Sequence, residues 1–141
     1  MKRILSFTTI FTLFLALCAC DPQQQHYNDV PQIAFALKTY SFNVNSAVNS
    51  VTIPVQLIAK EAQGAITGTV SVNSASTCAG AVTVPTSVTI DAGRFLTNLV
   101  ITVNHGSLNA GNANRLILDL SASGVKVAGN YKQVTITLNK Q

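Results

Sequence analysis

Apolar and polar residues alternate with a period of two over most of the chain beyond residue 32. The alternation is clearest over Val51–Leu57, Leu116–Leu120 and Val134–Leu138, where every second residue is Val, Ile or Leu. Successive side chains of a strand point to opposite faces, so this period is typical of strands with one buried face. Further runs of the same kind cover residues 33–37, 40–44, 66–72, 82–84, 88–90 and 99–103.

Short turn sequences separate these runs, among them Asp91-Ala92-Gly93 and Gly129-Asn130. The runs are rich in Val, Ile and Thr, whose β-branched side chains suit a pleated, half-buried surface. Pro54 lacks an N–H, so we expect its run at a sheet edge or a bulge, or with that backbone position directed outward. The chain therefore predicts an all-β fold, a single Ig-like antiparallel β-sandwich of seven to eight strands over residues 32–141.

The N-terminus follows a different pattern. Lys2 and Arg3 precede an apolar run from Ile4 to Leu17, which Asp21-Pro22 ends. A basic start, an apolar stretch and small residues at its exit are typical of a secretory signal. A membrane-spanning helix needs ~20 apolar residues, which this run does not reach. Residues 1–19 are therefore predicted to be a helical signal peptide.

Leu17-Cys18-Ala19-Cys20 resembles a bacterial lipobox, in which a small residue stands directly before the acylated Cys. Ala19 satisfies this for Cys20, whereas bulky Leu17 precedes Cys18. We predict that Cys20 is the lipid attachment site and that residues 20–31 form the lipidated Cys and a flexible tether. A plain secreted protein is the alternative. We expect a lipid-anchored protein of the cell envelope at the outer membrane, and the inner membrane stays open because Asp21 resembles a retention signal there.

Several of the strand runs carry a family resemblance. Val51-Thr-Ile-Pro-Val-Gln-Leu57, Val88-Thr-Ile-Asp-Ala-Gly93 and Leu116-Ile-Leu-Asp-Leu120 resemble Calx-beta sandwiches and the Ig-like domain of unknown function in Bacteroidetes-type surface lipoproteins. The resemblance implies a β-sandwich, and for the lipoproteins a link to glycan uptake. Calx-beta domains can bind calcium through clustered acids. Glu61, Asp91 and Asp119 are far apart here, so we expect no calcium or other metal.

Charge and motif content argue against nucleic-acid binding and catalysis. Without Lys2 and Arg3 the chain keeps seven basic and five acidic residues, and the basic residues form no stripe. His105 is the only His of the predicted domain, and no nucleophile elbow or phosphate-binding glycine loop is present. We therefore expect no enzyme activity, no catalytic residues and no cofactor. Cys78 is interpreted as a small packed residue, with a reactive or dimer-forming thiol as the alternative.

Three hypotheses for the function remain. The first is a non-catalytic, lipid-anchored binding or accessory module for a protein or envelope partner. The second is a glycan-binding lipoprotein of a polysaccharide-uptake system, and the third is a structural envelope protein. Arg94, Phe95 and Tyr131 are the candidate ligand-binding residues. An exposed aromatic cluster would favour glycan binding, and a long unpaired strand edge would favour a protein partner added as a strand.

The variant Cys20→Ala tests the anchor. It is expected to abolish membrane association and fatty-acid labelling, because stable anchoring needs two or more acyl chains at ~0.8 kcal/mol per buried CH₂. Both are measured by fractionation and labelling of the expressed full-length chain. Cys18→Ala is the matched control and should change neither. Labelled, membrane-bound Cys20→Ala protein would show that the lipid is attached elsewhere.

Overall fold

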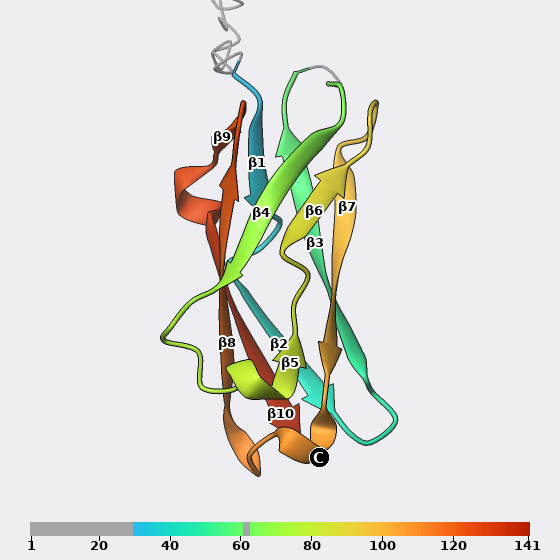
Figure 1. The fold of residues 1–141 in the computed structure, drawn as a ribbon, viewed down its shortest axis with the longest axis vertical. Helices are drawn as coiled ribbons and strands as arrows, with labels where there is room; N and C mark the ends of the chain where they lie inside the picture. The colour runs from blue at the N-terminus through green and yellow to red at the C-terminus, as the bar shows by residue number, and fades with distance from the viewer. Residues whose placement is uncertain (1–29, 61–62) are drawn as a thin grey trace, which may run out of the picture.

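The computed structural model describes residues 30–60 and 63–141, which form two five-stranded sheets packed face to face (Figure 1). Sheet A has the order β5 (Val82–Thr83), β7 (Leu96–Val103), β3 (Ser50–Ile58), β1 (Gln32–Phe35), β9 (Lys126–Val127). Sheet B has the order β2 (Thr39–Val44), β10 (Gln133–Lys140), β8 (Gly111–Ala122), β4 (Ile66–Val72), β6 (Ser87–Ile90). The predicted all-β sandwich is confirmed.

Eight of these strands have four residues or more, and β5 and β9 have two each. The predicted count of seven to eight therefore describes the longer strands, and β9 was not predicted. The described part of the chain also contains three single-turn 3₁₀ helices, namely η1 (Ala79–Ala81), η2 (His105–Ser107) and η3 (Gly129–Tyr131). No helix in this part of the chain is long and apolar enough to cross a membrane. The predicted signal peptide, Cys20 and most of the predicted tether lie outside the described residues.

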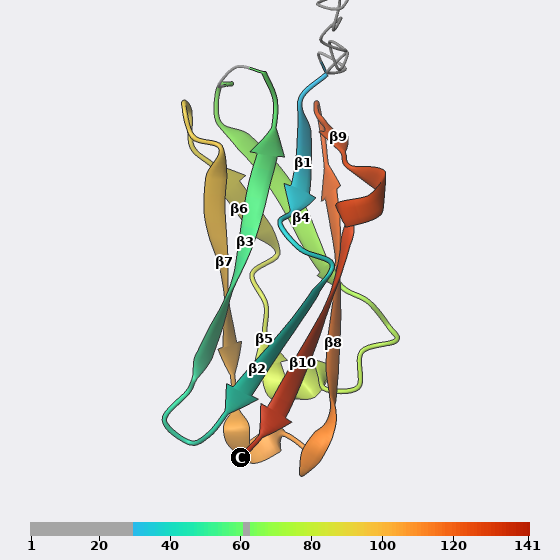
Figure 2. The same cartoon turned by 180° about the vertical axis from the view of Figure 1, so that it is seen from behind.

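Two strand pairs are parallel, which the prediction of an antiparallel sandwich did not include. β1 pairs in parallel with β9, and β2 pairs in parallel with β10. Both pairs arise because the chain leaves sheet A after Phe35 and enters sheet B at Thr39, as the view from behind shows (Figure 2). The alternation that predicted Leu37 on the buried face is wrong at that residue, which is exposed because it lies in this crossing.

The core lies between the two sheets and consists of the inward residues of the alternating runs. In β10, for example, Val134, Ile136 and Leu138 are fully buried. The largest other buried side chains come from strands of both sheets and include Phe35, Ile33, Ile53, Leu99, Ile101, Leu116 and Leu118. Burying one such side chain stabilises the fold by about 1.5–3 kcal/mol, so this shared core holds the sheets together.

Pro54 lies in the middle of sheet A, on strand β3 between β1 and β7. Its carbonyl oxygen accepts a hydrogen bond from Ala36 N (3.0 Å), just beyond the last residue of β1. In an antiparallel strand the backbone nitrogen and the C=O of one residue point to the same side, so the Pro54 nitrogen is also directed toward β1. Because β1 ends there, the missing N–H interrupts no continuing ladder, and an interior strand tolerates proline.

Asn114 on β8 is fully buried, and the alternation pattern did not identify it. Its Oδ1 accepts a hydrogen bond from Asn109 N (2.8 Å), and its Nδ2 donates to Asn109 O (2.8 Å) and to Leu138 O (3.2 Å). The side chain therefore fastens the loop before β8 to the end of β10. Buried amides of this kind are kept because each group has a partner.

The variant Asn114→Ala is expected to destabilise the protein by about 3 kcal/mol, because the Asn109 backbone loses its partners at a buried site. The measurement is the free energy of unfolding from urea titration. Asn98→Ala, at an exposed position of β7, is the control and should change stability by less than about 0.5 kcal/mol. Equal stability of the two variants would show that the buried amide does not hold the loop.

Candidate functional site

The three candidate ligand-binding residues do not come together. Arg94 ends the turn between β6 and β7, where its N donates to Asp91 O (3.0 Å) and Gly93 has a positive φ of 77°. Phe95 follows and is 43% exposed, whereas Tyr131 lies on η3 and is 36% exposed. The β6–β7 turn and η3 lie on opposite flanks of the sandwich in both views (Figures 1 and 2). Phe95 and Tyr131 therefore form no common aromatic surface.

Tyr40 does not supply an aromatic platform either. Its ring stacks on Phe42 with centroids 6.0 Å apart and planes inclined by 9°. Both rings are half-buried and pack against the hydrophobic core from the edge strand β2. Their stacked faces are thus used within the fold.

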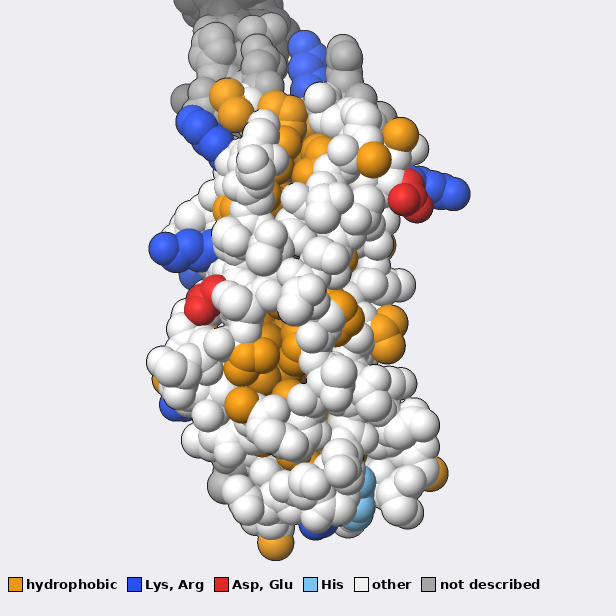
Figure 3. All heavy atoms as spheres, viewed as in Figure 1, with side chains coloured by type: hydrophobic (Ala, Val, Ile, Leu, Met, Phe, Trp, Pro, Cys, Tyr) orange, Lys and Arg blue, Asp and Glu red, His pale blue; other side chains and the backbone are white. Residues whose placement is uncertain are grey.

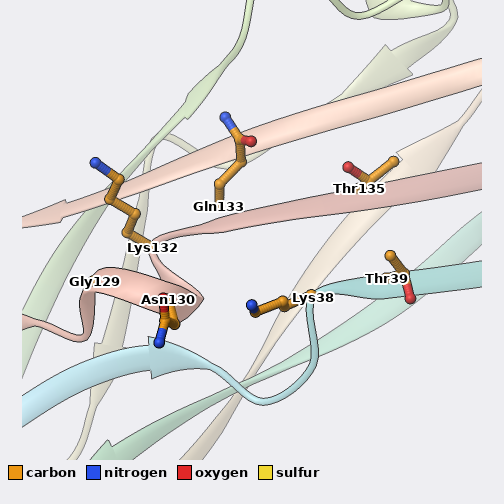
Figure 4. Close-up of a pocket in the computed structure, with 7 residues that line it drawn as sticks. All are labelled: Lys38, Thr39, Gly129, Asn130, Lys132, Gln133 and Thr135. Carbon is orange, nitrogen blue, oxygen red and sulfur yellow. The ribbon is translucent and has the colours of Figure 1, made fainter.

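A hollow of about 400 Å³ lies beside Tyr131, between the start of β2 and the start of β10 (Figure 4). The Lys38 ammonium lies 5.5 Å from the centroid of the Tyr131 ring, a cation–π contact. In Figure 4 the Lys38 side chain extends toward Asn130 of η3, whereas Lys132 and Gln133 extend away from Lys38. The lining residues are Lys38, Thr39, Gly129, Asn130, Lys132, Gln133 and Thr135.

The chemistry of this hollow suits binding. Its lining offers two ammonium groups, two hydroxyls and two amides, and it contains no Asp, Glu, His or Cys. These groups can hold hydroxyl or anionic groups of a ligand through hydrogen bonds and charge. Gln133 is partly engaged already, because its Nε2 donates to Asp119 Oδ1 (2.8 Å).

The titratable residues considered from the sequence lie apart. Asp119 accepts hydrogen bonds from the amides of Asn73 (2.7 Å) and Gln133, whereas His105 Nε2 lies 3.1 Å from Gln141 O at the C-terminal end. Cys78 is buried, and burial raises the pKa of its thiol, which disfavours the nucleophilic thiolate. Within residues 30–60 and 63–141, no three His, Cys, Asp or Glu side chains gather as a metal site. Glu61 lies outside the described residues.

The outer edge of β7 was not identified from the sequence. Toward β3, Phe95 O accepts from Leu57 N (2.8 Å) and Val103 N donates to Asn49 O (2.8 Å). In an antiparallel strand the N–H and C=O of one residue point to the same side, and alternate residues point to opposite sides. The even-numbered residues between Phe95 and Val103 therefore direct their backbone N–H and C=O groups away from β3. These residues are Leu96, Asn98, Val100 and Thr102.

Only the last of these outward positions is covered by a described strand. β5 pairs with β7 at Val103 and Thr102 and extends no further. At the other end, the tight turn at Asp91–Arg94 precedes the strand. Leu96–Val100, the segment that we call the β7 edge, thus leaves the N–H and C=O groups of Leu96, Asn98 and Val100 without a described strand beside them.

The side chains of the β7 edge are unusually apolar for an exposed strand. Leu96 is 57% exposed and Val100 is 49% exposed, and with Phe95 they make up three of the seven large apolar residues found exposed in the described chain. No charged residue occurs from Phe95 to Val103. In Figure 3 acidic and basic side chains gather at the tip of the β6–β7 turn, and none marks the flank of β7 below it.

The other two long free edges are polar. The solvent-facing side chains of β2 are those of Thr39, Ser41 and Asn43, and the solvent-facing side chains of β6 are those of Ser87 and Thr89. The sequence did contain a signal for the difference, because Leu96 and Val100 interrupt the alternation with apolar residues on the outer face. For the hollow beside Tyr131 the sequence contained no comparable signal, because Lys38 is a single basic residue between two strand runs.

Neither a protein-family model nor a curated protein matches this chain. Among solved structures, the Calx CBD1 domain in its apo form is similar with a TM-score of 0.61 and 13% identity, over 79% of this chain and 98% of that domain. A Bacteroides ovatus protein named for carbohydrate binding has a TM-score of 0.58 and 17% identity, over 77% of this chain and 37% of its own length. The periplasmic chaperone SfaE has a TM-score of 0.54 and 10% identity, over 77% and 58%. These likenesses show a Calx-beta-like β-sandwich.

Proposed function

We propose that this protein is a non-catalytic, lipid-anchored module of the bacterial cell envelope that binds a protein partner through the β7 edge. The observation that carries the proposal is the row of backbone groups at Leu96, Asn98 and Val100 that no described strand pairs, flanked by exposed apolar side chains. The anchor rests on the lipobox-like Leu17-Cys18-Ala19-Cys20, and the binding role agrees with the fold that the chain shares with a protein named for carbohydrate binding and with a chaperone.

The β7 edge is suited to one kind of ligand. N–H and C=O groups that recur on every second residue are matched in spacing by the backbone of another extended strand. Strand addition of this kind gains affinity from main-chain hydrogen bonds and selectivity from alternate side chains. Edges that must stay single usually carry Lys, Pro or a bulge, and from Leu96 to Val103 this strand has no Lys or Pro and pairs with β3 in one unbroken register.

A photo-crosslinking side chain in place of Val100, in the full-length chain within host membranes, tests this function. We expect a discrete protein adduct on irradiation, because that position flanks the added strand. The same side chain in place of Thr69, on the exposed face of the interior strand β4, is the control and should give none. Adding Asn98→Pro, which removes the central free N–H, should abolish the adduct without unfolding the protein. An undiminished adduct would contradict strand addition.

A second candidate function is glycan binding at the hollow beside Tyr131. The observation that favours it is the set of ammonium, hydroxyl and amide groups around this hollow, with Lys38 fixed over the Tyr131 ring. Such groups suit a saccharide that carries carboxylate or other anionic groups. The hollow and the β7 edge lie on different flanks, so each is tested by its own variants.

For this candidate we expect Lys38→Ala to weaken binding to an acidic polysaccharide by about tenfold or more, since a charge-assisted hydrogen bond is lost. Lys60→Ala, which removes an exposed lysine away from the hollow, is the control with the same change in net charge. The measurement is calorimetric titration with neutral and acidic saccharides. No binding to any saccharide, or equal binding by both variants, rules glycan recognition out at this hollow.

A further inference from the structure

We infer that the partner of the β7 edge is a second copy of this chain, which pairs with it antiparallel about Asn98. This inference rests on the proposed function, in which the β7 edge is the contact surface, and it names the occupant of that surface. The two copies of sheet A would then join into one continuous sheet. Three properties of the segment point to self-pairing, namely its register, its side chains and its charge.

The register follows from which backbone groups are already engaged. With Asn98 opposite Asn98 of the second copy, Leu96 lies opposite Val100 in both directions, and each of these opposed pairs exchanges both N–H···O bonds. Moving the register one way places Arg94 opposite Val100, but Arg94 N already donates to Asp91. Moving it the other way places Leu96 opposite Thr102, which β5 already pairs. The Asn98-centred register therefore uses every free group of the segment and no engaged one.

The side chains are complementary in this register. Residues opposite each other in an antiparallel pair lie close enough for their side chains to pack. Exposed Leu96 would pack on exposed Val100 of the second copy, and the two Asn98 amides would face each other across the two-fold axis. Apolar meets apolar and amide meets amide, which is the self-complementarity that an isologous interface requires.

The charge distribution offers no repulsion along the segment. No charged residue occurs between Phe95 and Val103, so two copies bring no like charges together there. β2 and β6 present Thr, Ser and Asn at their free edges and lack the apolar pair that this contact uses. The exposed apolar residues Leu96 and Val100 therefore favour β7 over β2 and β6 as the strand that pairs with a second copy.

The pairing also sets the orientation of the two domains. Because the paired strands are antiparallel, the end of the sandwich at which β1 begins points in opposite directions in the two copies. If the strands of the dimer lie parallel to the membrane plane, the starts of the two β1 strands are at the same distance from the bilayer. Each stretch from Asp21 to Pro31 can span up to roughly 36–40 Å when extended, so both can lead to lipids in one bilayer.

The test measures the mass of the full-length protein in mild detergent by sedimentation over roughly a hundredfold range of concentration. We expect a monomer–dimer equilibrium for the unaltered chain. The double variant Leu96→Lys with Val100→Lys should be monomeric throughout, because the pairing opposes two lysines. The double variant Leu96→Lys with Val100→Glu should still form a dimer, now weakened by salt, because each lysine meets a glutamate of the second copy. Both variants change only exposed positions, so at concentrations where the parent is monomeric they should unfold at the same temperature as the parent.

Cysteine cross-linking tests the Asn98-centred register. Paired residues at hydrogen-bonded positions have Cα atoms about 5.5 Å apart, within the span of a disulfide. Asn98→Cys should form a covalent dimer on mild oxidation, and Thr69→Cys, exposed on β4, should not. An unaltered chain that stays monomeric, or two double variants of equal mass, overturns the inference. If position 100 then still cross-links to a different protein, the proposed function stands, and if it cross-links to none, both fail.

Discussion

The arrangement of this protein depends on one constraint, that the backbone groups of a sheet must find partners at its edges. In sheet A the chain meets part of this demand with short pieces of itself. β9 pairs with β1, and β5 pairs with the last residues of β7. The crossing between Phe35 and Thr39 lets one N-terminal segment contribute a strand to each sheet. The β7 edge is the apolar stretch that no described strand covers, and the proposed contact follows from that difference.

The two candidate surfaces rely on different forces. The β7 edge offers backbone hydrogen bonds and the apolar side chains of Leu96 and Val100, which depend little on salt. The hollow offers the ammonium groups of Lys38 and Lys132, whose attraction for anions is screened at physiological ionic strength. His105 lies 3.1 Å from Gln141 O and Asp119 accepts a hydrogen bond from Asn73, so neither residue belongs to the β7 edge or lines the hollow. Recognition is therefore the chemistry that both surfaces support.

Periodicity allowed much of the fold to be predicted, because the inward and outward faces of a strand follow from every second residue. It predicted the buried faces of β3, β8 and β10 and the turn at Asp91–Gly93. It could not predict which strands are neighbours, since pairing is decided by contacts between residues distant in sequence. For the same reason the parallel pairs, the position of Pro54 and the separation of Phe95 from Tyr131 emerged only from the structure.

In the proposed dimer, the backbone groups of Leu96, Asn98 and Val100 are free within one chain and paired between two. Amide hydrogen exchange, followed residue by residue at increasing protein concentration, measures this directly. We expect the amides of Thr97, Leu99 and Ile101 to be protected at every concentration, whereas those of Leu96, Asn98 and Val100 become protected only as the concentration rises. Protection of these three amides at the lowest concentration, or its absence at the highest, would contradict the account.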